Sequence, residues 1–406
     1  MVRSPMRPLK SLIPLEEGLR MCLESVSPVE RTEALPVLEA VGRVVAADVV
    51  SRIHVPLVDR AAMDGYAVRA QDTYGATKFK PKVLRQIERL YASSVPRKRI
   101  APGDCTEVAT GSTLPMGADG VVMVEDTEAE GDRVQVFKPA HPRQNIAPRG
   151  QDIAAGTPIL PAGTFLAPSK IGVLAALGIQ QVTVYARPRV AVIPSGNEVV
   201  PLGEPLAPGR IYDVNSHALA ALIREHGGLP RIFPVMKDTV QSVLDALRAA
   251  QESDLIVLSG GSSVGDRDVM VEALGRLGEV KFHGIAVRPG KPTLCGVVEG
   301  TLVLGMPGNP TSCLTNGYGL LVPALRVLAR LPQADRPAVT LPLARRVTSP
   351  LGRHEYLPVK VAEGQVVPVF KGSGAITSMA DADGYIEIPW NVEFLERGHP
   401  VDVRFF

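Results

Sequence analysis

The chain has 406 residues, of which 45% are hydrophobic, and its 44 basic and 42 acidic side chains leave a formal net charge of +2. This length allows about two to four domains of roughly 100–200 residues each. The balanced charge and the 4% aromatic content disfavour a non-specific nucleic-acid binder. No apolar run approaches the ~18 residues of a membrane span, and the N-terminal segment lacks the apolar core of a signal peptide.

The four cysteines predict reduced thiols. Cys22, Cys105, Cys295 and Cys313 form no C-x-x-C pair, and no histidine pair lies at zinc-ligand spacing. We therefore expect a cytoplasmic protein, with Cys313 as a buried side chain rather than a nucleophile.

Residues 12–50 are expected to be helical in two pieces. The apolar face of the first piece is formed by Leu15, Leu19, Cys22 and Leu23. The second piece starts near residue 35 and gives way to β-branched residues before residue 50.

Residues 51–150 alternate short strands with turns. The turn Glu130-Gly131-Asp132 predicts a hairpin between the alternating pair Val122 and Val124 and the pair Val134 and Val136. Residues 150–178 predict a turn-rich stretch and a short helix that ends at Gly178. This helix resembles the opening helices in composition, so it could pack on them and leave 51–150 as an inserted domain.

Residues 187–331 show an α/β pattern. Three apolar strands, in "RVAVIPSG", "DLIVLSGG" and "TLVLGMPG", each end in a glycine-bearing loop and are followed by helical segments. Another helix is predicted in "DTVQSVLDALRAAQES", capped by Asp238 or Thr239. Strands separated by helices predict a parallel sheet.

From residue 332 the helical period disappears. A hairpin that turns at Glu363-Gly364 and further short strands predict a small β-barrel or sandwich.

The three glycine loops should meet at one edge, because ligands of open parallel sheets bind at the carboxyl ends of the strands. In "SGGSSVGD", glycines let the backbone approach an anion closely, and a following helix adds positive charge. The segment therefore predicts a phosphate or oxyanion site with hydroxyl donors from Ser259, Ser262 and Ser263, and the alternative is a tight strand-to-helix turn. Neither a P-loop nor a G-x-G-x-x-G fingerprint is present.

Two acids, Asp266 and Asp268, follow that loop, and their negative charges would repel a phosphate bound there. A bound Mg²⁺ would offset this repulsion, because Mg²⁺ binds one or two carboxylates together with phosphate oxygens. Glu198 and Asp213 lie in loops that should reach the same edge. The alternative is that these acids cap a helix and lie on a solvated surface.

Two further turns carry polar groups. Arg288 and Lys291 bracket a Pro-Gly turn, which would hold two cations for a small dianion, unless it is an exposed basic turn. In "MPGNPTS", rigid prolines flank Gly308-Asn309 before a helix. The loop at 55–68 contains Asp59 and Asp64, and composition alone does not connect it to the glycine edge.

Taken in order, these segments resemble a known family. The stretches "AAMDGYAV", "GQDIAAGTPILPAG", "IPSGNEV", "GRIYDVNS", "SGGSSVGDRD", "RPGKP", "GMPGNPTS" and "GSGAITSM" are similar to those of the molybdopterin molybdenumtransferases, the MoeA family, which is related to the gephyrin E domain. The resemblance runs from about residue 10 to the C-terminus. Each motif is weak alone, and the ordered set is very specific.

The resemblance implies a multidomain α/β plus β fold. Residues 1–50 and 150–186 would form an elongated linking and dimerisation domain, and 51–149 the inserted β-rich domain. Residues 187–331 would form a three-layer α/β/α domain like the molybdopterin-binding fold, and 332–406 a C-terminal β-barrel. The family's homodimer would bring the loop at 55–68 to the partner's glycine edge.

The implied reaction inserts molybdenum from molybdate into adenylylated molybdopterin, with Mg²⁺ and with release of AMP. The implied catalytic residues are Asp59, Thr110, Asp152, Glu198, Asp238 and Asp268. Phosphate and molybdopterin would contact Ser259, Gly260, Gly261, Ser262, Gly265, Pro307, Gly308, Asn309 and Pro310. Molybdate would bind Arg288, Lys291, Arg353 and Ser373, and the metal would bind Asp266, Asp268 and Glu198. Partners would be the molybdopterin adenylyltransferase and the enzymes that accept the cofactor.

The sequence departs from the family in places. A common D-N-S-A-M-D-G-Y appears as "DRAAMDGY", family lysines near the basic turn appear as Gly284 and Arg288, and Asn197 replaces a common acid. Tungstate instead of molybdate is compatible with these residues. A molybdopterin adenylyltransferase or related pyrophosphatase would need mainly 187–331, and a non-catalytic scaffold would need only an apolar groove.

Overall fold

The computed structural model describes residues 12–260, 269–333 and 338–406. The chain divides into two compact units, the first formed by Met1–Ala34, Gly42–Val44 and Thr183–Phe406 and the second by Leu35–Val41 and Val45–Val182. The four domain boundaries expected from the sequence are finer than this division and stay a prediction. Within the described ranges, no helix has the length and apolar character that crossing a membrane requires.

A six-stranded mixed sheet forms the centre of the first unit. Its strand order is β16 (Leu229–Ile232), β13 (Arg189–Pro194), β17 (Leu255–Ser259), β21 (Thr301–Met306), β20 (Leu294–Val298) and β18 (Gly278–His283). The three predicted strands β13, β17 and β21 are parallel, as expected, and they are neighbours in the sheet. The sheet is nevertheless mixed, because the tight turn at Glu299 and Gly300, both with positive φ, folds β20 back antiparallel to β21.

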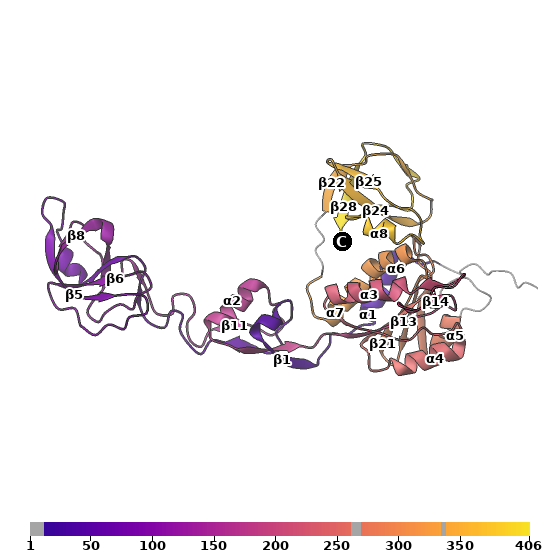
Figure 1. Ribbon diagram of the computed structural model, residues 1–406, viewed down its shortest axis with the longest axis horizontal. Coiled ribbons are helices and arrows are strands. Elements are labelled where there is room, and N and C mark those ends of the chain that lie inside the picture. The colour runs from indigo at the N-terminus through magenta and orange to yellow at the C-terminus, as the bar shows by residue number, and fades with distance from the viewer. Residues whose placement is uncertain (1–11, 261–268, 334–337) are drawn as a thin grey trace, which may run out of the picture. The chain divides into compact units, whose positions relative to one another are not determined.

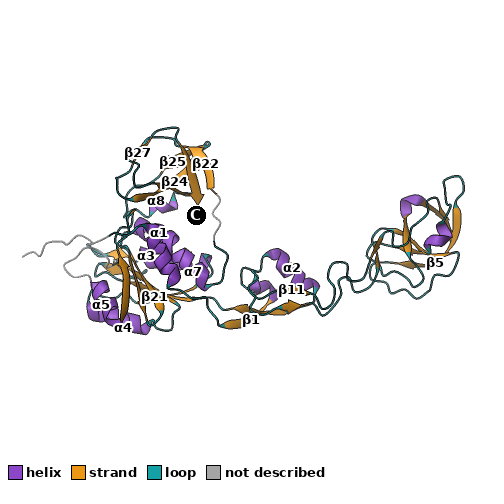
Figure 2. Ribbon diagram, turned by 180° about the vertical axis from the view of Figure 1, so that it is seen from behind, coloured by secondary structure: helices purple, strands orange, loops and turns teal. Residues whose placement is uncertain are grey.

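Helices cover both faces of this sheet (Figures 1 and 2). Val190 and Val192 of β13 face one core with side chains of α3 (Val214–Glu225), α7 (Val322–Leu328) and α1 (Leu15–Glu24). Ala191 and Ile193 face the opposite core with α4 (Val240–Ala249) and α5 (Val269–Leu277). Both faces are therefore buried, which explains why the strands are continuously apolar.

Helix α1 confirms the first predicted piece, and the second piece is wrong. Residues 35–50 contain only one turn of 3₁₀ helix, η1 (Val37–Ala40), before strand β2 (Val49–Val50). Gly42 has a φ of +75°, which an α-helix does not accommodate. The helix predicted after Gly308-Asn309 is confirmed as one continuous helical run, formed by α6 (Pro310–Asn316), the π-helical η4 (Gly317–Leu321) and α7.

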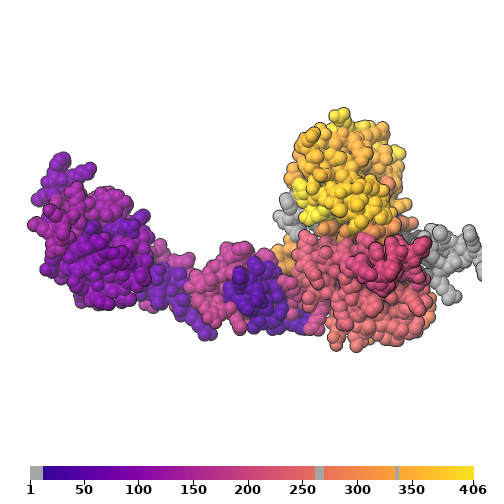
Figure 3. Space-filling view, in the orientation of Figure 1, coloured from indigo at the N-terminus to yellow at the C-terminus, as the bar shows by residue number. Residues whose placement is uncertain are grey.

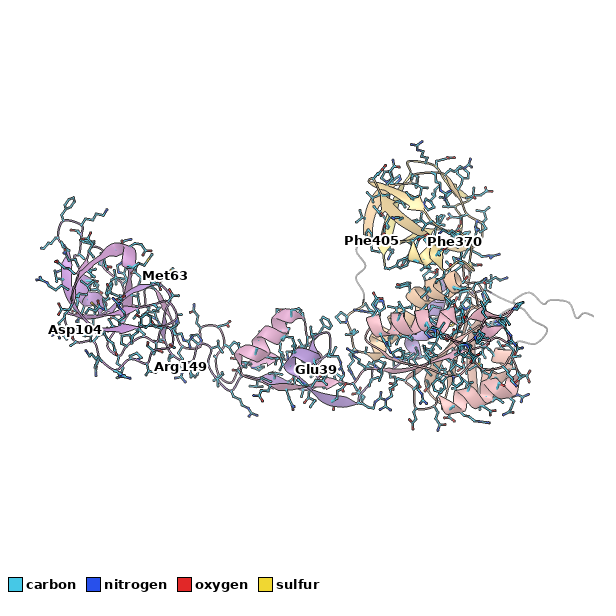
Figure 4. All side chains as sticks on the ribbon, in the orientation of Figure 1. Glu39, Met63, Asp104, Arg149, Phe370 and Phe405 are labelled. Atoms are coloured by element: carbon cyan, nitrogen blue, oxygen red, sulfur yellow. The ribbon has the colours of Figure 1, made fainter. Side chains whose placement is uncertain are left out.

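Strands of the C-terminal segment, together with β19, form a second six-stranded sheet in the first unit. Its order is β19 (Val287–Arg288), β24 (His354–Ala362), β26 (Gly384–Ile388), β28 (Pro400–Phe405) and β22 (Ala338–Pro342), and β25 (Gln365–Pro368) pairs with β24. The predicted hairpin is confirmed, with φ of +52° at Glu363 and +71° at Gly364. Phe370 and Phe405, labelled in Figure 4, pack partly buried against its core.

Shorter elements complete the first unit. Strand β23 (Val347–Thr348) pairs with β27 (Phe394–Leu395), and β14 (Val199–Val200) pairs with β15 (Ile211–Tyr212). Helix α8 (Thr377–Ala380) packs on α6. The space-filling view shows the yellow C-terminal residues against the orange and pink residues of the mixed-sheet region (Figure 3).

The second unit contains a sheet in the order β7 (Gly120–Met123), β4 (Gly65–Val68), β6 (Asp104–Val108), β5 (Lys82–Leu90), β9 (Arg133–Val136) and β8 (Thr127–Glu130). The predicted turn is confirmed, because Glu130 pairs with Arg133 across Gly131-Asp132. The predicted partner strand is wrong: β9 pairs with β8, whereas Val122 belongs to β7, which pairs with β4. The short η3 (Val124–Asp126) separates β7 from β8.

The remaining elements of the second unit return to the early part of the chain. Strand β10 (Ile146–Ala147) pairs with β3 (Arg60–Ala61), and β11 (Pro158–Leu160) pairs with β2. Helix α2 (Pro168–Ala176) packs on η1 and stops before Gly178, as predicted. The short η2 (Ala70–Thr73) follows β4. Strands β1 (Thr32–Pro36) and β12 (Gln181–Tyr185), whose residues are divided between the two units, also pair.

Candidate active site

The loops that follow β13, β17 and β21 meet in one open cleft of about 660 Å³. The cleft is lined by predicted phosphate-site residues, by neighbouring polar residues and by several apolar side chains. The lining is Pro194, Ser195, Glu198, Val199, Leu206, Ile211, Tyr212, Asp213, Val214, Asn215, Ser259, Gly260, Pro292, Pro307, Gly308, Asn309, Pro310, Ser312 and Gly374. The structure therefore brings the predicted loops together at the carboxyl edge of the parallel strands.

Backbone hydrogen bonds join the three loops. The Ser195 N–H donates to the Ser259 carbonyl at 2.8 Å, and the Gly260 N–H donates to the Met306 carbonyl at 3.2 Å. Gly260 has a φ of +90°, and a Cβ there would lie 2.5 Å from the Ser195 carbonyl oxygen. Glycine is thus required at residue 260 for close approach, whereas its own N–H is already used and does not face an anion.

Ser195 links the cleft to the start of α4. Its side chain is buried, and its hydroxyl donates to Asp238 Oδ1 at 3.0 Å. The N-cap of α4 is Thr239, whose hydroxyl accepts a hydrogen bond from the Ser242 N–H. Of the two N-cap candidates that the sequence offered, the structure therefore selects Thr239 over Asp238. Asp238 is left to orient a hydroxyl that lines the cleft.

The start of α3 forms another part of the cleft wall. Asp213 is buried and caps α3 by accepting from the Ser216 N–H at 3.0 Å. The Asn215 amide donates to the Gly308 carbonyl at 2.8 Å. The buried Asn215 Oδ1 has no hydrogen-bond partner among the described residues. Asn215 therefore fixes the loop after β21, and its carbonyl oxygen keeps an unused acceptor.

The loop after β21 is also tied to the C-terminal segment. Asn309 Nδ2 donates to Ser373 Oγ at 3.0 Å, and the Thr311 N–H donates to the Ser373 carbonyl at 3.0 Å. The Thr311 hydroxyl donates to the carbonyls of Ala375 at 2.8 Å and Gly372 at 3.3 Å. Ser373, predicted for molybdate, consequently lies beside the predicted phosphate loop.

Arg288 lies at a second cleft. Its guanidinium is 3.4 Å from Glu355 Oε1, and Glu355 is 3% exposed. Burial raises the pKa of Glu355, while the Ser349 hydroxyl and the Arg288 charge oppose that rise. This cleft of about 390 Å³ is lined by Arg288, Arg346, Thr348, Ser349, Pro350, Glu393 and Phe394.

Lys291 and Arg353, the two other predicted molybdate cations, are partly exposed. The Lys291 carbonyl accepts from the N–H groups of Ile285 and Thr293, both at 3.0 Å, so its backbone is fixed next to Pro292 of the first cleft. Arg353 directly precedes β24, the strand that contains Glu355.

Several predicted residues lie outside the described residues, namely Gly261, Ser262, Gly265, Asp266 and Asp268. Among the residues that are described, no group of three or more His, Cys, Asp or Glu side chains could hold a metal ion. Glu198 lines the cleft and is exposed. Its carboxylate is the type of hard oxygen donor that Mg²⁺ uses.

Cys313 does not have the properties of a nucleophile. It is 1% exposed, and both burial and the nearby Asp213 charge raise the pKa of its thiol. Raising the pKa keeps the thiol protonated, which removes the reactive thiolate. The expected buried role of Cys313 is confirmed.

The second unit contains the remaining predicted residues. Asp59 is exposed, and its Oδ1 accepts from the N–H of Arg149, which is labelled with Met63 in Figure 4, at 2.7 Å. Thr110 donates to Asp64 Oδ1 from its N–H at 2.6 Å and its hydroxyl at 2.8 Å. These bonds lower the pKa of Asp64. Asp152 is exposed, and its N–H donates to the Val55 carbonyl at 3.0 Å.

Sequence reasoning missed four polar residues at these clefts: Ser195, Asn215, Ser312 and Glu355. Ser195, Asn215 and Ser312 lie in the motifs "IPSGNEV", "GRIYDVNS" and "GMPGNPTS", so their position after a strand or before a helix was an available signal. Glu355 gave no such signal, because its role depends on the register that pairs it with Arg288 between β19 and β24.

Family comparisons cover nearly the whole chain. Residues 13–178 match the model of the MoeA N-terminal region (domain I and II), 191–327 match a probable molybdopterin binding domain, and 340–406 match the MoeA C-terminal region (domain IV). These matches define a multidomain MoeA-type architecture with a molybdopterin-binding type of α/β domain.

Individual relatives agree with the family models. Molybdopterin molybdenumtransferase 2 of Mycobacterium tuberculosis is 35% identical over 385 residues, which cover 92% of this chain and 95% of the relative. A crystal structure of a molybdopterin biosynthesis MoeA protein from Pyrococcus horikoshii has a TM-score of 0.84 at 40% identity, covering 97% of this chain and 99% of that one. The chain belongs to the MoeA family of molybdopterin molybdenumtransferases, and it is an enzyme of molybdenum cofactor biosynthesis.

Proposed function

We propose that this enzyme inserts molybdenum from molybdate into adenylylated molybdopterin and releases AMP. The observation that supports the proposal best is the cleft at the carboxyl edge of β13, β17 and β21, where Ser259, Gly260 and Ser312 stand beside the proline-flanked Asn309. Buried hydroxyls and closely approaching backbone suit a phosphoanhydride, which presents several anionic oxygens.

The molybdate side of the proposal rests on contacts between the two sheets. Ser373 is hydrogen-bonded to Asn309, so a dianion at Ser373 would lie next to the phosphate loop. Arg288 can contribute although it is paired with Glu355, because a guanidinium has five N–H donors and the Arg288 side chain is 39% exposed. Lys291 and Arg353 complete the proposed oxyanion set.

Mg²⁺ is proposed as the supporting cation, with Glu198 as its ligand among the described residues and Asp266 and Asp268 as the further ligands. When bound, Mg²⁺ would neutralise the charge that develops as the phosphoanhydride breaks. Ser195, held by Asp238, would orient the substrate through its hydroxyl at the same wall.

The proposed enzyme is a cytoplasmic homodimer in which Asp59, Thr110 and Asp152 of one subunit complete the site of the other. The proposed exchange partners are a molybdopterin adenylyltransferase and the enzymes that accept the finished cofactor. The four domain boundaries given above are proposed for each subunit.

The decisive experiment mixes purified protein with adenylylated molybdopterin, molybdate and Mg²⁺, and measures AMP and active cofactor. We expect both products to appear together. Robust ATP-dependent adenylylation of molybdopterin would instead favour an adenylyltransferase. Binding of partner peptides with no turnover would favour a scaffold.

Asp59→Asn is expected to keep the dimer folded and abolish AMP release, and the same is expected of Asp268→Asn. Asp48→Asn is a matched control for Asp59→Asn, because Asp48 Oδ1 accepts one backbone N–H, from Ala162 at 2.8 Å, much as Asp59 does from Arg149. Wild-type turnover in Asp59→Asn would refute its catalytic assignment. Equal losses in both variants would reduce Asp59 to a structural role.

A further inference from the structure

An apolar arm forms one wall of the cleft at the carboxyl edge of β13, β17 and β21. The arm comprises residues 199–214 and includes the paired strands β14 and β15. The Ile211 N–H donates to the Glu198 carbonyl at 2.9 Å, and the Asp213 N–H donates to the Val200 carbonyl at 3.0 Å. The Tyr212 hydroxyl donates to the Glu204 carbonyl at 2.9 Å. These bonds give the arm a defined conformation.

Of the apolar side chains with which the arm lines the cleft, four are exposed to solvent. Leu206 is 52% exposed, Ile211 54%, Tyr212 37% and Val214 37%. Single exposed apolar residues are ordinary on protein surfaces. Several that share the wall of a cleft with polar groups opposite them indicate a ligand with an apolar face.

The order of the strands places this arm at one end of the cleft. Along the sheet edge, the loop after β13 leads into the arm, the loop after β17 contributes Ser259 and Gly260, and the loop after β21 contributes Asn309. Beyond β21, the start of β20 follows Pro292 and the basic turn that contains Arg288 and Lys291. The phosphate region therefore lies between the apolar arm and the proposed molybdate residues.

This order gives the substrate a direction. The dithiolene of molybdopterin has to meet molybdate, so the molybdopterin half would extend from the phosphates toward β20. The nucleotide half is attached to the other side of the same phosphoanhydride and would extend toward β13. We propose that the arm binds the adenosine of adenylylated molybdopterin, with the adenine ring against Leu206, Ile211 and Val214. The inference rests on the proposed function, and it specifies which wall recognises the leaving nucleotide.

Paired variants and paired probes test this assignment. Ile211→Ser removes an apolar side chain from the cleft wall. Leu202→Ser is the matched control, because Leu202 is on the same arm and 56% exposed but is not among the described residues that line the cleft. Calorimetry of the full-length protein would measure the dissociation constants of AMP and of ribose 5-phosphate, which has the same phosphate and sugar without the base.

In the wild type, AMP should bind more tightly than ribose 5-phosphate. Ile211→Ser should weaken AMP roughly tenfold, as for loss of an apolar contact in a binding pocket, and leave ribose 5-phosphate unchanged. Leu202→Ser should change neither. Leu206→Ser provides a second variant with the same expectation as Ile211→Ser, which guards against a local folding defect.

Three results would overturn the inference. The first is AMP affinity that is equal in all variants. The second is Ile211→Ser weakening adenine-free molybdopterin and leaving AMP unchanged, because the substrate would then lie in the opposite direction. The third is a changed oligomeric state with unchanged AMP affinity, because the arm would then be a subunit contact. AMP release by the wild type in the turnover assay decides the proposed function separately.

Discussion

Replacement of Gly260 by alanine tests how closely the backbones of the loops after β13 and β17 approach each other in the cleft. Gly260 has a φ of +90°, and the new Cβ would lie 2.5 Å from the backbone carbonyl oxygen of Ser195. The left-handed backbone costs an L-residue about 1–2 kcal/mol. Forcing an atom into a packed contact adds about 1–3 kcal/mol, since a carbonyl in a strand-end loop cannot move as a side chain does. We expect Gly260→Ala to lose about 2–5 kcal/mol of local stability.

Gly300→Ala separates the two costs. Gly300 has a φ of +82°, and a Cβ there would have no atom within 4 Å. This variant should therefore lose only the conformational part, about 1–2 kcal/mol, and keep its AMP release. The difference between the two variants measures the close approach of the loops after β13 and β17.

Hydrogen exchange of peptides from β13 and β17 across a urea series would measure the local stability, and AMP release would measure the function. Gly260→Ala should expose these strands at lower urea and release AMP slowly. If Gly260→Ala and Gly300→Ala lose the same stability and both turn over normally, the loops are not in the contact that the structure shows.

Three further predictions concern other contacts. Thr311→Val leaves the Ala375 carbonyl without the 2.8 Å hydroxyl donor, so hydrogen exchange of residues 372–378 should accelerate while β13 stays protected; unchanged exchange there would contradict the proposed tie. Cys313→Ala should release AMP at close to the wild-type rate, because burial raises the pKa of the Cys313 thiol, and a large rate loss with the fold intact would contradict this. The Thr110 hydrogen bonds lower the pKa of Asp64, which means that they stabilise the folded protein while the Asp64 carboxylate is ionised. This contribution to folding stability is fully present above the ordinary carboxyl pKa, and it is lost as the pH falls through the lowered pKa of the folded state. The thermal midpoints of wild type and Asp64→Asn should therefore converge on acidification, and a gap that stays constant with pH would refute the assignment.

The sequence predicted the local elements that depend on neighbours along the chain. The strands β13, β17 and β21 were recognisable because apolar runs ended at glycine loops. Their adjacency was decided by the tertiary structure, because β16 follows β13 along the chain and β18 and β20 precede β21, yet these strands lie outside the three in the sheet. The turn at Glu363-Gly364 was recognisable from its residues alone. The prediction of a helix after residue 35 was wrong, because local composition did not reveal that Gly42 would take a positive φ.

The sequence alone determined the family, the three parallel strands and the gathering of their loops at one edge, because these follow from periodicity, glycine placement and motif order. The tertiary structure decided which polar groups in those loops are free to bind a ligand and which are already paired within the protein. The Gly260 N–H is occupied by Met306, Ser195 is held by Asp238, and Arg288 faces a buried acid across a strand pair. Such partners are distant in sequence and meet only through strand register and packing, so no local pattern encodes them.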